Sequence, residues 1–176
     1  MIHFVGFVNE PGECLWIISE LIKGDNLFKA NFRKRLKPFQ KTKIAFEIAQ
    51  GMEYLKSKDI VHRDLKTPNI LLDGNVKSND VKPKICDFGF SRVDMSLKMS
   101  NRTGTLHYMA PEVIKGECYD FKADVFSYGM VLWELYAGEP PFYKYSPEEA
   151  EDLIKNNTPL NYPDDKFISP DLKQLI

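Results

Sequence analysis

The sequence reads HRDLKTPN at residues 62–69, and this stretch constrains the fold more than any other. Three further signals follow it in order: DFG at residues 87–89, APE at residues 110–112, and Asp124 at the start of an apolar run. Each signal alone is weak, because a single Asp most often serves as a helix cap or a turn residue. Their joint order is highly specific, with a strand between the first two and a Ser/Thr-bearing loop between the second and the third.

This ordered set resembles the protein kinase family, whose signatures are HRDLxxxN, DFG and APE. The resemblance covers essentially the whole chain. It implies an α+β, protein-kinase-like fold in which a mostly helical large lobe follows the last two strands of a small lobe. It also divides one kinase domain into residues 1–23, a partial small lobe with the hinge, and residues 24–176, a large lobe that is incomplete at its C-terminus.

Hydrophobic patterning on both sides of residues 62–69 predicts the same mixture of elements. Strands are predicted where β-branched and aromatic runs lie between turn residues, at 2–8, 14–18, 69–72 and 84–86. Helices are predicted from apolar periodicity, from a run that is apolar on nearly every side, or from Ser-Pro capping signals, at 44–55, 123–137, and from 146 and 169 onward. The first two strands form a predicted hairpin, and Gly138 ends the apolar helix.

Composition narrows the class of protein. The 176 residues carry 24 Lys plus Arg against 25 Asp plus Glu, a formal net charge of −1, so no large basic field would attract nucleic acid. The 3 cysteines lie far apart and suit neither a disulfide framework nor a zinc site. The N-terminus does not resemble a secretory signal and no apolar stretch is long enough to span a membrane. We therefore expect a cytoplasmic protein without a nucleic-acid or membrane partner.

The resemblance assigns the chemistry to a few side chains. Phosphoryl transfer from ATP depends on positioning and charge neutralisation, so it needs a carboxylate for the incoming hydroxyl and oxygen ligands for Mg²⁺. By resemblance, Asp64 accepts the proton of the substrate hydroxyl, and Lys66 places a cation near the transferred phosphate. Asn69 and Asp87 hold Mg²⁺, because hard cations prefer carboxylate and amide oxygens. Thr105 is expected to hydrogen-bond Asp64 and Lys66 and to orient them.

The resemblance also places part of the ATP pocket. Ser19 would be the gatekeeper at the end of the fifth strand, and the backbones of Glu20 and Ile22 would meet the adenine edge. Leu71 would form the apolar floor beneath the base, and Cys86 would border the pocket. An ordinary core strand and an ordinary hydrophobic pair are the alternatives, and for Leu71 alone core packing is the simpler interpretation.

Residues 87–112 would form the activation segment. Arg63 could pair with a phosphorylated side chain there through charge-assisted hydrogen bonds, and the candidates are Ser96, Ser100 and Thr103. The resemblance gives structural roles to a further set: His62, Phe88, Gly89, Glu112 and Asp124.

Neighbouring residues favour a protein Ser/Thr hydroxyl as the substrate. The Lys-Thr-Pro segment at 66–68 and the stretch GTLHYMAPE at 104–112 resemble the serine/threonine pattern. DVFSYG at 124–129 and WEL at 133–135 resemble the tyrosine-kinase-like group of serine/threonine kinases. Two alternatives stay open: a tyrosine or dual-specificity kinase, and a catalytically inactive kinase-like fragment that binds a protein partner through apolar surface.

The sequence departs from the family pattern at both ends. No three of its 10 glycines fit GxGxxG, and nothing before the hinge resembles the VAIK lysine or the helix glutamate that pairs with it. No arginine follows Arg102, so Glu112 lacks its family partner, and a carboxylate buried there would be costly. We therefore expect a kinase domain cut at both ends, and the activity of these residues by themselves is left open.

Overall fold

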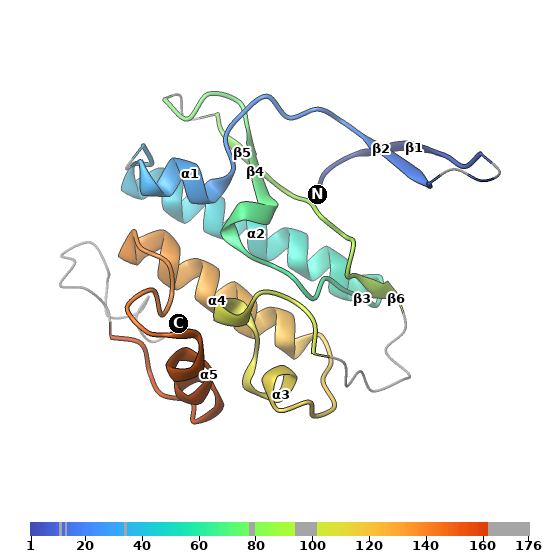
Figure 1. Ribbon diagram of the computed structural model, residues 1–176. Coiled ribbons are helices and arrows are strands. Elements are labelled where there is room, and N and C mark those ends of the chain that lie inside the picture. The colour runs from blue at the N-terminus through green and yellow to red at the C-terminus, as the bar shows by residue number, and fades with distance from the viewer. Residues whose placement is uncertain (11, 13, 34, 78–79, 94–101, 162–176) are drawn as a thin grey trace.

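A computed structural model describes residues 1–161 apart from 11, 13, 34, 78–79 and 94–101. The predicted helix near residue 169 and the candidates Ser96 and Ser100 lie outside the described residues. In the described part of the chain, the strands pair into two-stranded antiparallel sheets, β1 with β2, β3 with β6 and β4 with β5, and the helices form the body (Figure 1). The predicted α+β class is confirmed.

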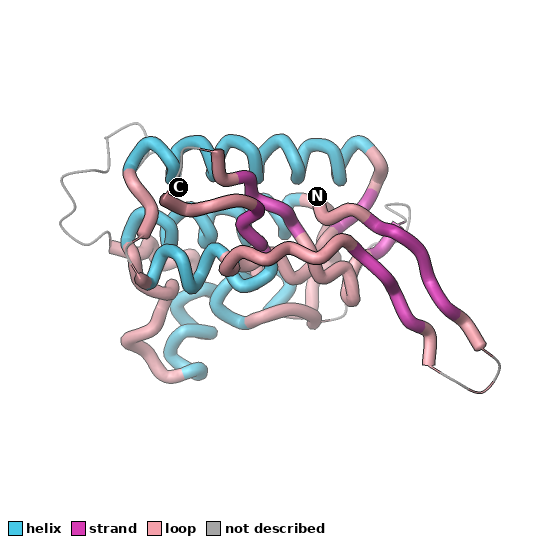
Figure 2. The backbone as a smooth tube through the Cα atoms, turned by 90° about the horizontal axis from the view of Figure 1, so that it is seen from above, coloured by secondary structure: helices cyan, strands magenta, loops and turns pink. Residues whose placement is uncertain are grey.

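The N-terminal hairpin pairs β1 (Phe4–Val8) with β2 (Trp16–Ser19), as predicted. Figure 2 shows it extending away from the helices. The Ile2 N–H donates to the Ile85 carbonyl at 2.9 Å, and Lys84 Nζ pairs with Glu20 Oε1 at 3.0 Å. These two contacts hold the base of the hairpin to residues 84 and 85. Its large apolar side chains are exposed in the described structure: Phe4, Val5, Phe7, Val8, Trp16, Ile17 and Ile18.

Two helices follow the hairpin. The short α1 (Leu27–Phe32) begins at Asn26, whose side chain accepts the Lys29 N–H at 2.9 Å. The long α2 (Pro38–Ser57) contains the predicted periodic residues, and Ile44, Ile48 and Leu55 are buried. Burial of each such side chain stabilises the fold by about 1.5–3 kcal/mol. The helix begins earlier than the periodicity alone indicates, because a proline suits its first turn.

Four short strands frame the central loops: β3 (Ile60–Val61), β4 (Ile70–Asp73), β5 (Lys82–Ile85) and β6 (Arg92–Val93). The predicted bounds of β4 and β5 were wrong by one or two residues. Asn69 ends a 3₁₀ turn, η1 (Thr67–Asn69), because its N–H donates to the Lys66 carbonyl at 2.9 Å. Strand β5 begins at Lys82, since Asp73 pairs with Lys82 across the ladder.

The helix α4 (Lys122–Ala137) is the central element of the fold. Its Val131, Leu132 and Leu135 belong to a core shared with α1, α2, β4 and β5. Its Ala123 belongs to a second core shared with α3 (Pro111–Ile114) and α5 (Pro147–Lys155). The predicted burial of this helix is confirmed, and both cores hold it in place.

Local signals set the ends of the last helices. Gly138 ends α4 in the left-handed region at φ 76°, which glycine adopts without steric cost. Ser146 Oγ accepts the Glu149 N–H at 3.2 Å, and Glu149 Oε2 accepts the Ser146 N–H at 2.8 Å, a reciprocal cap at the start of α5. Among the described residues, no helix combines the length and the apolar character needed to cross a membrane.

Candidate active site

The loop at residues 62–69 is anchored to the first turn of α4 by Asp124. The Asp124 carboxylate accepts the backbone N–H of His62 at 2.7 Å and that of Arg63 at 2.9 Å. Arg63 has a φ of 72°, a conformation that a non-glycine residue keeps only when its surroundings enforce it. Burial raises the pKa of Asp124 above its ordinary value, and the two N–H donors oppose that rise.

His62 links this loop to the DFG segment. The Asp64 N–H donates to His62 Nδ1 at 3.3 Å, so the ring proton lies on Nε2, which donates to the Cys86 carbonyl at 3.1 Å. The ring of Phe88 lies 5.0 Å from the His62 ring, centroid to centroid. His62 is fully buried and therefore acts as a structural connector.

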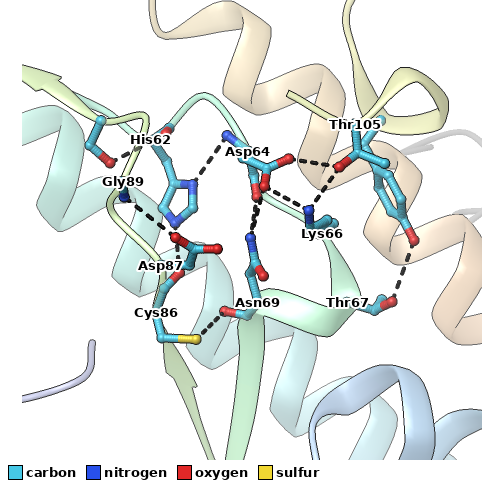
Figure 3. A network of polar contacts seen from close by, with 11 residues as sticks. His62, Asp64, Lys66, Thr67, Asn69, Cys86, Asp87, Gly89 and Thr105 are labelled. Atoms are coloured by element: carbon cyan, nitrogen blue, oxygen red, sulfur yellow. Dashed lines mark hydrogen bonds and ion pairs between the residues drawn. The ribbon is translucent and has the colours of Figure 1, made fainter. Parts of the chain in front are cut away.

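Three side chains converge on the Asp64 carboxylate (Figure 3). Lys66 Nζ lies 2.7 Å from Oδ2, Asn69 Nδ2 donates to Oδ2 at 3.1 Å, and Thr105 Oγ1 donates to Oδ1 at 2.9 Å. Lys66 Nζ also donates to Thr105 Oγ1 at 2.8 Å. The Asp64 side chain is 3% exposed, and these contacts fix its orientation.

The approach of Thr105 to Asp64 depends on Gly104. A Cβ on Gly104 would lie 2.6 Å from the Arg63 carbonyl oxygen, closer than real Cβ atoms come. Gly104 also has a φ of 119°, which L side chains rarely adopt. A glycine is therefore required where residues 104–108 cross the loop.

A backbone hydrogen bond between Cys86 and Asn69 brings Asn69 close to Asp87, the residue that follows Cys86. The Cys86 N–H donates to the Asn69 carbonyl at 2.9 Å, and Asp87 follows with a φ of 65°. Asp87 is exposed, and its carboxylate accepts a long 3.4 Å contact from the Gly89 N–H. Burial, with a smaller effect of the Asp87 charge, raises the pKa of the Cys86 thiol, which favours its neutral form.

This donor set fits a hard divalent cation that shares its ligands with a phosphate. One amide and one carboxylate are available, and Mg²⁺ characteristically takes one or two protein ligands together with phosphate oxygens. Within the described ranges no group of three or more His, Cys, Asp or Glu side chains could hold a metal without such help.

The residues expected at the adenine pocket lie at the end of β2, in the segment that follows it and on β4. Ser19 is exposed at the end of β2, and Ile22 and Leu71 are half-buried. The side chain of Glu20 is engaged by the His3 N–H at 2.7 Å and by Lys84, and these contacts lower its pKa. The linker after Ile22 runs along β4, since Asn26 pairs with Leu71 in an antiparallel bridge.

Arg63 reaches one of the three residues expected to be phosphorylated. Its Nη2 donates to Thr103 Oγ1 at 2.7 Å, and its guanidinium lies 5.9 Å from the centre of the Tyr119 ring. Its Nε is buried and has no hydrogen-bond partner among the described residues. Ser96 and Ser100 lie outside the described residues.

Glu112 differs from the expectation of a buried carboxylate. It is only half-buried, in the first turn of α3, and it lines a cavity of about 280 Å³ with Cys118, Tyr119, Asp120 and Lys122. Solvent contact reduces the cost of leaving such a charge without a cation.

Sequence reasoning missed one polar cluster next to Asp64. Glu134 on α4 accepts hydrogen bonds from Tyr108 at 2.6 Å and from Thr67 at 2.8 Å, and it is 2% exposed. Its signal in the sequence is a carboxylate within an otherwise apolar run, because Glu is almost never fully buried unless paired.

Comparisons with known proteins agree with this geometry. A family model described as "Protein kinase domain" matches residues 1–176. The chain is 37% identical over 183 residues to "Probable serine/threonine-protein kinase SIS8" of Arabidopsis thaliana, which covers 100% of this chain and 17% of that protein. It is 38% identical over 186 residues to "Serine/threonine-protein kinase VIK" of the same plant, with 100% and 41% covered.

A third relative comes from another lineage. "Probable serine/threonine-protein kinase kinX" of Dictyostelium discoideum is 36% identical over 202 residues, covering 99% of this chain and 18% of that protein. The chain thus spans between 17% and 41% of the length of these curated relatives. The predicted resemblance is confirmed: this chain belongs to the protein kinase family, and the relatives it matches are serine/threonine kinases.

Proposed function

We propose that this chain carries the large-lobe catalytic residues of a serine/threonine protein kinase, which transfers the γ-phosphoryl group of ATP to a protein hydroxyl. The observation that carries the proposal is the Asp64 carboxylate, buried and oriented at once by Lys66, Asn69 and Thr105. A carboxylate in this setting can accept a proton from an incoming hydroxyl without having to be reoriented first.

Each residue has a defined part in the reaction. The substrate hydroxyl gives its proton to Asp64, its oxygen forms a bond to the γ-phosphorus, and the bond from that phosphorus to the bridging oxygen breaks to release ADP. Lys66 lies 2.7 Å from Asp64 and would neutralise charge on the transferred group. Thr105 holds both side chains, as its hydrogen bonds at 2.9 Å and 2.8 Å permit.

Asn69 and Asp87 are the residues that would hold Mg²⁺. When bound, the cation would neutralise charge on the phosphates. Asn69 uses its amide nitrogen for Asp64, at 3.1 Å, so its amide oxygen is the atom available to a metal. Residues 1–23, with Ser19, Glu20 and Ile22, and Leu71 on β4 would supply the part of the nucleotide site that this chain contains.

The first experiment replaces the proposed proton acceptor. We expect Asp64→Asn to lower kcat for transfer from radiolabelled ATP to casein by about 10²–10⁴-fold, the worth of a positioned acid–base group. Asp152→Asn, at an exposed position on α5, is the matched control and should leave kcat unchanged. A near-normal rate for Asp64→Asn would remove Asp64 from this role.

The product of that assay identifies the substrate class. Phosphoserine and phosphothreonine in the hydrolysed casein are expected, and phosphotyrosine would favour the tyrosine or dual-specificity alternative. Absence of transfer by the wild-type protein would favour the non-catalytic binding module.

The contact between Arg63 and Thr103 supports a regulatory role for this segment. A phosphate on Thr103 would replace a neutral contact with charge-assisted hydrogen bonds to Arg63, whose Nε is otherwise unpaired among the described residues. We expect Thr103→Ala to remove the loss of activity that phosphatase treatment causes. Unchanged phosphatase sensitivity would turn attention to Ser96 and Ser100.

We further expect the protein to act in the cytoplasm. The support is that Cys14, Cys86 and Cys118 are all free thiols, which suits a reducing compartment.

A further inference from the structure

The positive charge of this chain is concentrated in one stretch of its sequence. Residues 23–43 hold 8 of the 24 Lys and Arg residues but 1 of the 25 Asp and Glu residues. This stretch therefore has a formal charge of +7, while the rest of the chain has −8. A local field of this kind attracts anionic groups even though the whole chain is close to neutral.

Helix α1, within this stretch, is fixed to the body by its inner face. Asn31 Nδ2 donates to the carbonyl of Glu134 on α4 at 2.8 Å, and the Leu72 N–H on β4 donates to the carbonyl of Asp25 at 2.9 Å. Three residues of the helix are buried: Leu27, Ala30 and Asn31. The outer face is therefore preorganised, which lowers the conformational cost of binding a partner.

The outer face of α1 combines aromatic rings with positive charge. A helix turns by about 100° per residue, so positions 28, 29, 32 and 33 lie on the side away from the buried residues. Phe32 is 68% exposed, and its ring stacks on that of Phe28 with the two centroids 6.2 Å apart. Lys29 and Arg33 are exposed on the same side.

Two arginines converge on one carboxylate oxygen next to this face. Arg33 Nη1 and Arg35 Nη1 lie 3.1 Å and 2.7 Å from the same atom, Asp25 Oδ2. No other described residue accepts a hydrogen bond from either guanidinium group. Each guanidinium has five N–H donors, so both can bind a further carboxylate while they keep Asp25. The α1 surface is defined by these residues: Phe28, Lys29, Phe32, Arg33 and Arg35.

We propose that the α1 surface is a docking site for a short acidic segment of a protein partner. Asp or Glu carboxylates of that segment pair with Arg33 and Arg35, and an apolar side chain of the segment packs on the rings of Phe28 and Phe32. Charges at the rim of such a contact select the partner and speed its association, while the aromatic contact adds affinity. This binding does not depend on phosphoryl transfer.

The charge distribution favours a short segment over an extended polyanion. Outside residues 23–43 the chain has a formal charge of −8, so a membrane surface or a long nucleic acid that reached beyond the α1 surface would meet charge of its own sign. Figure 1 shows α1 on the opposite side of the molecule from the β1–β2 hairpin. The apolar side chains exposed on the hairpin are therefore not part of this docking site.

Fluorescence anisotropy on the full protein tests the proposal. The probe is a short fluorescein-labelled peptide that repeats the sequence Asp-Glu-Leu. We expect Arg33→Gln and Arg35→Gln each to weaken binding about 2- to 5-fold, the range of one exposed ion pair. Asp25→Asn should instead tighten binding by about the same factor, because it removes the carboxylate that competes for both guanidinium groups.

Arg102→Gln is the matched control for the loss of one positive charge. Arg102 is 47% exposed, against 50% for Arg33, and it pairs with Glu151 at 2.6 Å, outside the α1 surface. This variant should bind the peptide as the wild type does.

Phe32→Ala tests the aromatic contact separately from the charge. It should weaken binding of the Asp-Glu-Leu peptide by about fivefold, the effect of one moderate contact residue. It should not change binding of a second peptide in which Ala replaces every Leu.

Several results would overturn the proposal. The wild-type protein might not bind the peptide, Arg33→Gln might bind it as tightly as Arg102→Gln does, or Phe32→Ala might leave its affinity unchanged. Vesicles of phosphatidylserine and a DNA duplex are measured at the same ionic strength. If either binds more tightly than the peptide and loses affinity in Arg33→Gln, the surface recognises a membrane or a nucleic acid instead.

Discussion

Replacement of Glu134 by Gln should change how the stability of the fold depends on pH. Burial raises the pKa of Glu134 from 4.5 to about 7 in the folded protein, and the group is 2% exposed, so solvent screens it little. Between those two values the unfolded chain has lost this proton while the folded chain keeps it. Raising the pH through this window therefore lowers the free energy of unfolding.

The magnitude follows from the size of the shift. A difference of about 2.5 pKa units at 1.36 kcal/mol per unit corresponds to about 3 kcal/mol, fully lost above pH 7 and fully recovered below pH 4.5. Gln cannot ionise, and it keeps an oxygen that can accept from Thr67 and Tyr108. The Glu134→Gln variant should therefore lack this particular loss of stability.

Urea unfolding at several pH values between 4.5 and 8 measures the effect. The free energy of unfolding of Glu134→Gln minus that of the wild type should rise by about 3 kcal/mol across this range, because all other titrating groups cancel in the difference. Glu148→Gln, an exposed position on α5, should leave that difference constant. A Glu134→Gln difference that stays constant within about 0.5 kcal/mol would refute the reasoning.

Further predictions concern the proposed metal ligand Asp87, the close approach of Gly104 to the Arg63 carbonyl, and the Ser146 cap of α5. Asp87→Ala should abolish Mg²⁺-dependent nucleotide binding measured by calorimetry, because it removes the only carboxylate among the proposed ligands; unchanged affinity for Mg²⁺-ATP would argue against that role. Gly104→Ala should cost on the order of 1–3 kcal/mol in thermal unfolding and lower kcat, since its Cβ would meet the Arg63 carbonyl; equal melting temperatures would contradict the close approach. Ser146→Ala should lower the free energy of unfolding by about 1 kcal/mol through loss of the α5 cap, with kcat unaffected.

Local features of the fold were predictable because they depend on residues a few positions apart. The periodicity of Ile44, Ile48 and Leu55 is enough to predict α2, and Gly138 is enough to end α4. The first residue of β4 was harder to predict from the sequence, because the 3₁₀ turn that ends at Asn69 depends on one hydrogen bond to Lys66. The exposure of Glu112 could not be read from its motif either, since it depends on how α3 sits on its neighbours.

In the candidate site, too, some features could be predicted from the sequence and others could not. The order of motifs led to Asp64, Asn69 and Asp87 as candidates; the structure joins the side chains of Asp64 and Asn69, and a backbone hydrogen bond from Cys86 to Asn69 places Asp87 beside them in the chain. The partnership of Thr67, Tyr108 and Glu134 was not accessible, because these residues come from three segments and none follows a local pattern that names the others.

The amino-acid sequence by itself determined the family, the order of the elements and the residue types at the reacting centre, because motif spacing, helix periodicity and capping are local properties of the chain. The family resemblance also indicated that Thr105 orients Asp64, but only the tertiary structure decided that Asn69 donates to the same carboxylate and which carboxylates hold its loop. The physical reason is that the packing of two cores around α4 brings Asp124 and Glu134 to opposite ends of that loop. Such contacts between distant segments form only when the helix packs into both cores.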